Sequence, residues 1–437
     1  MEKLKNRIFV VHLGCSKNQV DAECLVTEFL SVGFKTVKTP ESADYILINT
    51  CGFIEAAKEE AIDTILSHTA KKKKGQKIIV TGCLSQRYAN ELPAEIPEVD
   101  FWEGTYKPGN LLLKMGLIDK HSCKDIPFRQ NLSEYKHHAY LKIAEGCDRL
   151  CAYCAIPLIR GRQVSRTIED IVSEAKRLET SGVQELTLIA QDTTYYGREK
   201  NAPGKGFFKD LLKALLQETN IRWIRSLYWY PEFIDDELLE LIAKEKRLCK
   251  YIDLPIQHAS DNVLKAMNRR YSAKELKNIL LKIREKIPGV TLRTTVLVGF
   301  PGETHEDFEE LMNLIDEIQF EHLGGFVYSK EEGTLAEKLK LKEVPESEAR
   351  ARLDAISERA EEIALEKNEA WIGKEITVLL DEEASGSEFH FYGRTEGNSL
   401  DVDDIVRVVE GSGTVGTFRK ALVLDASAHE LDVKLLD

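Results

Sequence analysis

Three cysteines packed into one short segment constrain this chain more than any other feature. Cys147, Cys151 and Cys154 are spaced Cys-x-x-x-Cys-x-x-Cys and directly follow an apolar, strand-like run. Three thiolates at this spacing can bind three irons of a 4Fe-4S cube and leave the fourth iron without a protein ligand. A zinc site normally takes four ligands, and no histidine stands at a spacing that would supply the fourth locally. We therefore expect a reactive cluster rather than zinc or three buried structural thiols.

This spacing resembles that of the radical S-adenosylmethionine (SAM) superfamily. The resemblance implies that the amino and carboxylate groups of SAM bind the open iron. One electron from the reduced cluster then cleaves SAM and yields a 5'-deoxyadenosyl radical. The protein places the cofactor and excludes water, while the cluster and SAM supply the chemistry. The superfamily does not by itself identify a substrate.

Composition indicates an ordinary globular protein of several domains. The chain has 437 residues, of which 43% are hydrophobic and 30% are charged. No run approaches the roughly 18 to 20 apolar residues that a membrane span requires. The basic start at Met1–Arg7 resembles a signal peptide, but the apolar run that follows it is too short, so we expect a first strand there. Nine cysteines without a disulfide framework favour a reducing, cytoplasmic location.

A second cysteine set comes from the first hundred residues. Three short apolar runs, each typical of a buried parallel strand, end in a cysteine: Arg7–Cys15, Asp44–Cys51 and Lys77–Cys83. A helical stretch is expected after each run, at Gln19–Val32, Ile54–Lys71 and Ser85–Leu92. Right-handed crossovers place the carboxyl ends of such strands on one edge of an open sheet, so the three thiols should converge. Cys24, Cys123 and Cys249 lack this placement and are expected to be ordinary thiols.

The middle of the chain alternates strand-like and helical segments. Six runs are expected to be strands: Tyr140–Ala144, Glu185–Ala190, Arg222–Tyr228, Tyr251–Pro255, Thr291–Val298 and Leu323–Tyr328. Helices are expected between them, for example at Ile168–Thr180, Ala273–Lys286 and Glu306–Ile318. Six such units predict a partial (βα)6 barrel that is open on one side, with its active edge at the carboxyl ends of the strands.

Polar residues at these strand ends are candidates for SAM contacts. The residues expected to bind SAM are Tyr153, which lies within the cysteine segment, and Gln191, Asp192 and Gln257 at strand ends. His258 and Ser329 also follow predicted strands and are further candidates for the cavity. Each of these residues is equally plausible as a surface or capping residue.

The C-terminal part changes to short alternating strands after a charged helical stretch. Strands are expected at Glu375–Leu380, Phe389–Tyr392, Ile405–Val409, Gly413–Phe418 and Ala421–Leu424, which predicts a small five-stranded β-barrel. From Trp371 to Asp437 there are 14 Asp and Glu against 6 Lys and Arg, a net charge of −8. This charge argues against direct nucleic-acid binding and suits a basic partner such as a ribosomal protein. An acidic surface that only favours solubility is the simpler alternative.

Several short motifs extend the resemblance to nearly the whole chain. They are Leu13-Gly-Cys-Ser-Lys-Asn18, the segment Gly146–Pro157 around the triad, Arg160-Gly161 with Ser165-Arg166, Gln191-Asp-Thr-Thr194 and Tyr392-Gly-Arg-Thr395. Together with the three predicted modules, they resemble the methylthiotransferases and, within that group, the RimO family. The related tRNA-modifying MiaB type usually has Asn where this chain has Asp148. The segment at 397–404 departs from the usual family pattern, which concerns substrate docking rather than catalysis.

The resemblance implies two 4Fe-4S clusters and a methylthio transfer. Cys147, Cys151 and Cys154 would hold the SAM-cleaving cluster, and Cys15, Cys51 and Cys83 would hold an auxiliary cluster that carries exogenous sulfide or polysulfide. Members of the family modify the β-carbon of an aspartate in small-subunit ribosomal protein twelve. They use SAM as methyl donor and as radical source, with a low-potential electron donor protein. No membrane contact is expected.

The expected domains follow from these patterns. They are an N-terminal α/β domain with the auxiliary cluster (1–125), a radical SAM partial barrel (133–345), a helical linker (346–370) and an acidic, substrate-docking TRAM-like β-barrel (371–437).

Three alternative functions stay open. A MiaB-type tRNA methylthiotransferase shares every cysteine, but a basic final barrel would favour it. An iron-sulfur electron carrier should have complete four-ligand sites, and a structural iron-sulfur or zinc adaptor should not turn over SAM.

Overall fold

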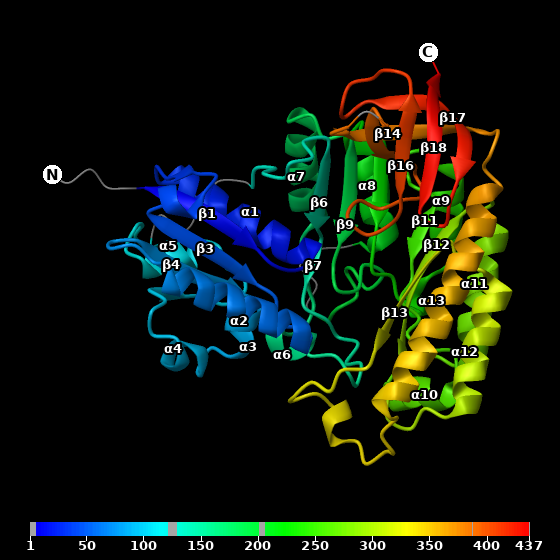
Figure 1. The fold of residues 1–437 in the computed structure, drawn as a ribbon, viewed down its shortest axis with the longest axis horizontal. Helices are drawn as coiled ribbons and strands as arrows, with labels where there is room; N and C mark the ends of the chain where they lie inside the picture. The colour runs from blue at the N-terminus through cyan, green and yellow to red at the C-terminus, as the bar shows by residue number, and fades with distance from the viewer. Residues whose placement is uncertain (1–5, 121–128, 201–205, 387, 437) are drawn as a thin grey trace.

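The computed structural model describes residues 6–120, 129–200, 206–386 and 388–436. It confirms an α/β fold in which a parallel sheet, a partial parallel barrel and a small closed barrel follow one another along the chain (Figure 1). Cys123 lies outside the described residues. Within these ranges, no helix combines the length and the apolar character needed to cross a membrane.

The N-terminal sheet has five parallel strands in the order β2-β1-β3-β4-β5. Its strands are β1 (Arg7–His12), β2 (Lys35–Thr36), β3 (Tyr45–Thr50), β4 (Lys77–Gly82) and β5 (Phe101–Trp102). Its main helices are α1 (Ser16–Ser31), α2 (Glu55–Ala70) and α5 (Asn110–Lys114). Nearly every residue of β3 and β4 is buried, as the continuous apolar runs predict for strands covered on both faces.

The helix expected at Ser85–Leu92 was only partly correct. The chain instead forms two short helices, α3 (Cys83–Arg87) and α4 (Leu92–Glu95), separated by a turn. Pro93 stands in the first turn of α4. The first helix ends earlier, at Tyr88, whose φ of −115° and ψ of 39° lie outside the helical region. Pro93 lies beyond the expected helix and suits the start of the second one.

The central region contains six parallel strands arranged as the expected partial barrel. They are β6 (His138–Lys142), β9 (Glu185–Ile189), β10 (Trp223–Ser226), β11 (Tyr251–Asp253), β12 (Thr291–Val298) and β13 (His322–Val327). Backbone hydrogen bonds on both sides of Ile224, to Arg247 and Cys249, join the β10 edge to the segment that leads into β11. The outer helices are α7 (Ile168–Thr180), α8 (Phe208–Glu218), α9 (Asp236–Lys244), α10 (Asp261–Ala266), α11 (Ala273–Lys286) and α12 (His305–Ile318).

The N-terminal region spans the open side of this barrel. On one side, α1 packs against β6, and Asp21 of α1 pairs with Lys142 of β6. On the other side, Glu331 lies just after β13 and pairs with Lys58 at 3.1 Å and with Arg87 at 2.8 Å. The two edge strands β6 and β13 form no backbone ladder with each other in the part of the chain that is described. The N-terminal sheet therefore supplies the wall that the partial barrel lacks.

The C-terminal module is a closed barrel that follows the long helix α13 (Glu346–Glu369). Its strands are β14 (Glu375–Glu383), β15 (Phe391–Arg394), β16 (Ile405–Glu410), β17 (Phe418–Ala426) and β18 (Glu430–Leu436). The strand expected at Gly413–Phe418 was wrong, because this glycine-containing stretch makes a turn with a φ of +79° at Gly416. The fifth strand is β18, whose alternating burial follows a period of two that its sequence also shows.

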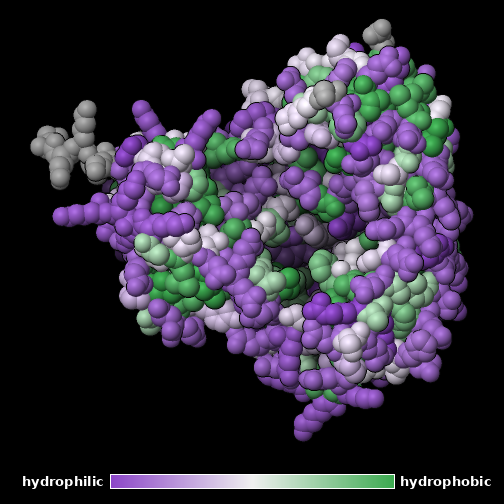
Figure 2. Space-filling view, viewed as in Figure 1, coloured by the Kyte–Doolittle hydropathy of each residue, from purple (hydrophilic) through white to green (hydrophobic). Residues whose placement is uncertain are grey.

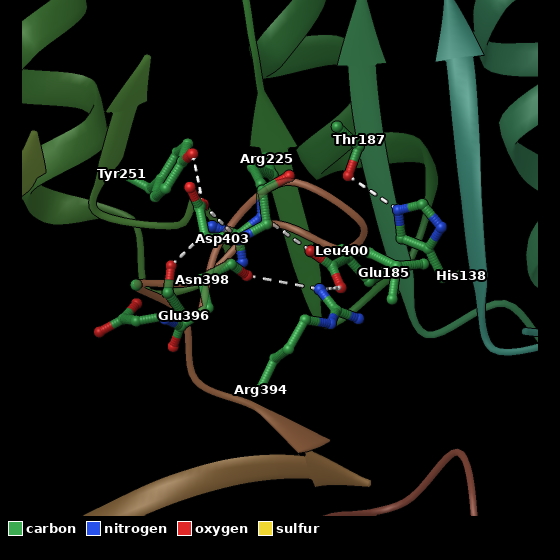
Figure 3. Close-up of polar contacts among 12 residues, drawn as sticks. His138, Glu185, Thr187, Arg225, Tyr251, Arg394, Glu396, Asn398, Leu400 and Asp403 are labelled. Carbon is green, nitrogen blue, oxygen red and sulfur yellow. Dashed lines mark hydrogen bonds and ion pairs between the residues drawn. The ribbon is translucent and has the colours of Figure 1, made fainter. Parts of the chain in front are cut away.

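A buried ion network joins the C-terminal barrel to the amino-terminal ends of the central strands (Figure 3). The Arg225 guanidinium and the Glu185 carboxylate are both fully buried and pair at 2.9 Å. Arg394 of β15 pairs with Glu185 at 2.7 Å and with Asp381 at 2.8 Å. Buried pairs contribute specificity more than stability, because the attraction between the charges must first offset their desolvation. The network therefore fixes how the two barrels are oriented.

The segment at 397–404 also lies in this interface. The Tyr140 hydroxyl donates to the Leu400 carbonyl, and Asp403 accepts a hydrogen bond from Tyr251 at 2.6 Å and pairs with Arg293 at 3.1 Å. The Asp403 side chain is only 1% exposed. This segment thus closes the amino-terminal end of the partial barrel, and the Asp403 carboxylate is not available to a docking surface on the C-terminal barrel.

His322 should make this interface sensitive to pH. Burial lowers the pKa of His322, but Asp403 and Asp404 outweigh burial and raise it to about 9 from 6.5. A raised folded-state pKa gives stability that is complete below about pH 6.5 and is lost as pH rises through about 9, by at most about 3 kcal/mol. We expect the thermal midpoint of the parent, relative to His322→Gln, to fall over this range in calorimetry.

The matched control is His305→Gln, because His305 is 72% exposed. It removes a histidine outside this interface and is measured over the same pH range. A parent-minus-His322→Gln difference that stays constant between pH 6 and 9.5 would contradict this account of the interface.

Candidate functional site

All six cysteines of the two triads line one cavity of about 1260 Å³. The cavity lies between the N-terminal sheet and the carboxyl ends of the central strands, and Figure 2 shows the hollow between these two lobes. The lining cysteines are Cys15, Cys51, Cys83, Cys147, Cys151 and Cys154. Two cysteine sets that lie far apart in sequence therefore open into the same space.

The strand ends position the N-terminal triad. Cys15 and Cys51 follow β1 and β3, and Cys83 begins α3 directly after β4. The parallel register places Thr50 opposite Gly82, so Cys51 and Cys83 leave the sheet at the same edge. Gly82 has a φ of +103°, and a Cβ there would lie 2.4 Å from the Thr50 carbonyl oxygen. Only glycine allows the backbone to approach so closely and to turn Cys83 into the cavity.

The central triad is held by a tight backbone loop after β7 (Ala144–Glu145). The Cys147 amide donates to the Gly161 carbonyl at 3.1 Å, and the Ala152 amide donates to the Met267 carbonyl at 2.8 Å. Gly146 has a φ of +77°, and a Cβ there would lie 2.2 Å from the Arg162 carbonyl oxygen. These contacts fix the path of the loop independently of any metal.

Burial makes most of these thiols poor thiolates on their own. It raises the pKa of Cys147 to about 12 and the pKa of Cys83 to about 11, in the latter case against the lowering effect of Arg160. Burial also raises the pKa of Cys51 and of Cys154. A bound metal stabilises the thiolate, so metal binding here would release protons. The donor set suits a soft, thiolate-binding centre.

The described side chains do not converge on a site for a single ion. Among the described residues, no three His, Cys, Asp or Glu side chains form a group that could hold one metal ion. A 4Fe-4S cube binds each cysteine through a different iron, so its protein ligands need not meet at one point. Mononuclear zinc would need such a meeting point.

Arg269 provides an independent test of fit to an anionic cluster. Its guanidinium Nη1 lies 3.7 Å from the Cys151 sulfur, and its Nη2 donates to the Pro255 carbonyl at 2.6 Å. The side chain is buried and stacks 4.6 Å from the centre of the Tyr230 ring. Within the described ranges it has no carboxylate partner. A buried cation is costly without an anion beside it, and a thiolate-bound 4Fe-4S cube carries net negative charge.

The expected SAM-contact residues lie on the same cavity. Tyr153, Gln191, Asp192, Gln257 and Ser329 all line it. The Gln191 amide nitrogen donates to Glu145 at 3.3 Å, while its Oε1 is buried without a hydrogen-bond partner. An unpaired buried acceptor is costly, so this oxygen is available to a ligand. The Asp192 carboxylate already pairs with Arg149 at 2.5 Å.

His258 is not among the lining residues. Its ring is fully buried, its Nδ1 accepts a hydrogen bond from the Ser260 amide, and its Nε2 lies 3.7 Å from Glu303. The turn after β11 directs this side chain into the core.

Sequence reasoning missed the basic residues of the cavity. Arg149, Arg160 and Arg269 line it, and so does Lys17, whose Nζ lies 3.2 Å from the centre of the Tyr228 ring. Arg160 belongs to one of the motifs that carry the family resemblance. Its contact with Cys83 of the N-terminal triad depends on tertiary structure and could not be predicted from that motif. Arg269 follows a short helix, and its sequence context gave no signal.

Two family models match the chain, one over each cysteine triad. Residues 141–315 match the model of the Radical SAM superfamily, and residues 7–104 match the model described as Uncharacterized protein family UPF0004. Each match covers one cysteine triad.

Curated relatives resemble the chain over almost its whole length. A protein of Clostridioides difficile named ribosomal protein uS12 methylthiotransferase RimO is 43% identical and covers 97% of this chain and 98% of its own length. Proteins with the same name from Chloroherpeton thalassium and Aquifex aeolicus are each 42% identical, over 99% of this chain and at least 98% of their own length. Among solved structures, the radical SAM methyltransferase TsrM of Kitasatospora setae has a TM-score of 0.54 at 13% identity. It covers 74% of this chain and 75% of its own, and supports the fold alone.

Proposed function

This chain belongs to the RimO family of radical SAM methylthiotransferases, and we propose that it adds a methylthio group to the β-carbon of an aspartate in ribosomal protein uS12. The observation that carries the proposal is the convergence of both cysteine triads on one cavity. A carbon–hydrogen bond of this kind offers nothing to acid–base catalysis at neutral pH. The chemistry therefore needs a radical source and a sulfur carrier within reach of the same carbon.

The central triad would hold the cluster that binds and cleaves SAM. When bound, this cluster and SAM supply a carbon radical strong enough to remove hydrogen from the substrate. The chain's own residues prepare the place for it. Arg269 supplies positive charge beside Cys151, and Gln191, which lines the cavity, has a buried side-chain oxygen without a hydrogen-bond partner. We propose Tyr153, Asp192 and Gln257 as further SAM contacts, because they line the same space.

The N-terminal triad would hold a second 4Fe-4S cluster, which receives sulfur from exogenous sulfide or polysulfide. Two observations favour this assignment: Cys51 and Cys83 leave the sheet at the same edge, and Cys83 is buried. SAM would serve as methyl donor for this sulfur and, separately, as radical source.

The domain boundaries and cellular setting are also proposals. We propose domains at 1–125, 133–345 and 371–437, with residues 346–370 as a linker that contains all of α13. We propose a cytoplasmic location, where reducing conditions preserve the clusters. We also propose that a low-potential protein donates the electrons and that the substrate is modified during ribosome assembly. The acidic C-terminal barrel suits a basic ribosomal protein better than it suits tRNA.

We expect single substitutions to separate the functions of the two triads. Cys151→Ala should abolish 5'-deoxyadenosine formation and lower the iron content of the anaerobically reconstituted protein from about eight to about four per chain. Cys51→Ala should lose a similar share of iron but still cleave SAM, and it should transfer no methylthio group. The measurements are iron analysis and chromatography of SAM products.

Cys24→Ala is the matched control, because Cys24 lies outside the cavity lining. It should retain the iron and both activities of the parent. Methylthio transfer at the parent rate by Cys51→Ala, or tightly bound zinc in place of iron, would contradict the two-cluster proposal.

Substrate choice can be tested directly. Reconstituted protein, incubated anaerobically with SAM, reductant, sulfide and uS12, should increase the mass of one uS12 aspartate by a methylthio group. Mass spectrometry of peptides locates the change, and unmodified tRNA in a parallel reaction should stay unchanged. Methylthiolated tRNA with unmodified uS12 would show that the MiaB-type alternative is correct.

A further inference from the structure

Arg160 lies between the two cysteine triads. It is the last residue of α6 (Ile156–Arg160), a short helix that begins two residues after Cys154. Its side chain is only 1% exposed, and its Nη2 lies 3.3 Å from the sulfur of Cys83 in the N-terminal triad. The same Nη2 also donates to the Asn18 side-chain oxygen. A residue that follows one triad thus donates to a sulfur of the other.

The second arm of the guanidinium is held by two carboxylates. Nη1 lies 3.0 Å from Asp21 of α1 and 2.8 Å from Glu145 of β7, two residues before Cys147. Lys142 pairs with both carboxylates, at 2.7 Å in the case of Glu145. Two cations and two carboxylates therefore meet at one point. Lysine could not occupy this position equivalently, because only the planar fork of arginine reaches several acceptors in fixed directions.

Packing makes this contact rigid. Cys83, Ala155 and Ile159 form one small buried cluster, so Cys83 packs on the segment that directly follows Cys154. Asn18 supports the same place, because its side-chain amide donates to the Thr50 carbonyl at 2.9 Å and its oxygen lies 3.5 Å from the Cys83 sulfur. The donor and the sulfur are thus held by the core rather than by a flexible loop.

A hydrogen bond from a buried cation to a cluster sulfur favours the more reduced, more negative state of that cluster. Cys83 is the N-terminal cysteine that accepts such a bond in the described contacts. We propose that Arg160 is a positioning residue that raises the reduction potential of the auxiliary cluster, and that Asp21 and Glu145 moderate this effect. The inference rests on the proposed binding of that cluster by Cys15, Cys51 and Cys83.

The test uses the full-length chain with Cys147, Cys151 and Cys154 replaced by alanine, so that only the auxiliary cluster is present. Its midpoint potential is measured by redox titration followed by electron paramagnetic resonance. Arg160→Gln should keep its iron and shift the potential to more negative values. Arg160→Lys should shift it in the same direction but by less, because the charge remains while the fork is lost.

Asp21→Asn gives the opposite sign. Removing one carboxylate leaves the positive charge of the guanidinium beside Cys83 less compensated. The reduction potential should therefore shift to more positive values. If these substitutions only loosened the site, both variants would shift the reduction potential in the same direction. The control is Arg162→Gln, because Arg162 is 65% exposed and, in the described part of the chain, forms an ion pair with Asp148 alone. Its potential should equal that of the parent.

Three results would overturn the inference. Equal potentials in the parent and in Arg160→Gln at full iron content would show that the contact does not tune the cluster. Loss of iron from both Arg160 variants would show a purely structural role. Absence of iron from the alanine background itself would refute the auxiliary cluster and, with it, this inference, whereas modification of uS12 by the parent would still support the proposed function.

Discussion

The structure depends on closing an incomplete barrel with a separate sheet. Six parallel strands leave one side open, and the N-terminal sheet covers it through buried ion pairs at both edges. Asp21 faces Lys142 at one edge, and Glu331 faces Lys58 and Arg87 at the other. Because parallel strands present their carboxyl ends at one edge, this closure brings the two active edges together. A single cavity with two cysteine triads follows from that arrangement.

Electrostatics then determines what the cavity can hold. Burial disfavours free thiolates at Cys83 and Cys147, while buried arginines stand against a sulfur of each triad. Arg160 is balanced by two carboxylates, whereas Arg269 has tyrosine, carbonyl and sulfur neighbours only among its described contacts. An anionic, thiolate-bound cluster satisfies both the thiols and the arginines. The central site, with its uncompensated cation, also suits the carboxylate of SAM.

Local sequence signals were enough to predict the fold class and the convergence of the three N-terminal cysteines at one edge of the sheet. Apolar runs ending in Cys15, Cys51 and Cys83 predicted strands whose ends converge, because the parallel topology leaves few alternatives. Sequence patterns gave wrong or incomplete predictions for some element boundaries and for the burial of single charged residues. A turn at Tyr88 ended an expected helix early, and β18 was missed although its period of two was visible. The burial of Asp403 could not be predicted, because a count of charges does not show which carboxylates face another module.

The central claim is that the two clusters face each other across one cavity. Electron paramagnetic resonance of the fully reconstituted, doubly reduced protein tests it most directly. Two paramagnetic centres that share a cavity should interact, so the spectrum should be broader than the sum of spectra from the two single-cluster variants, and each centre should relax faster than it does alone. A spectrum equal to that sum, with unchanged relaxation, would contradict the claim.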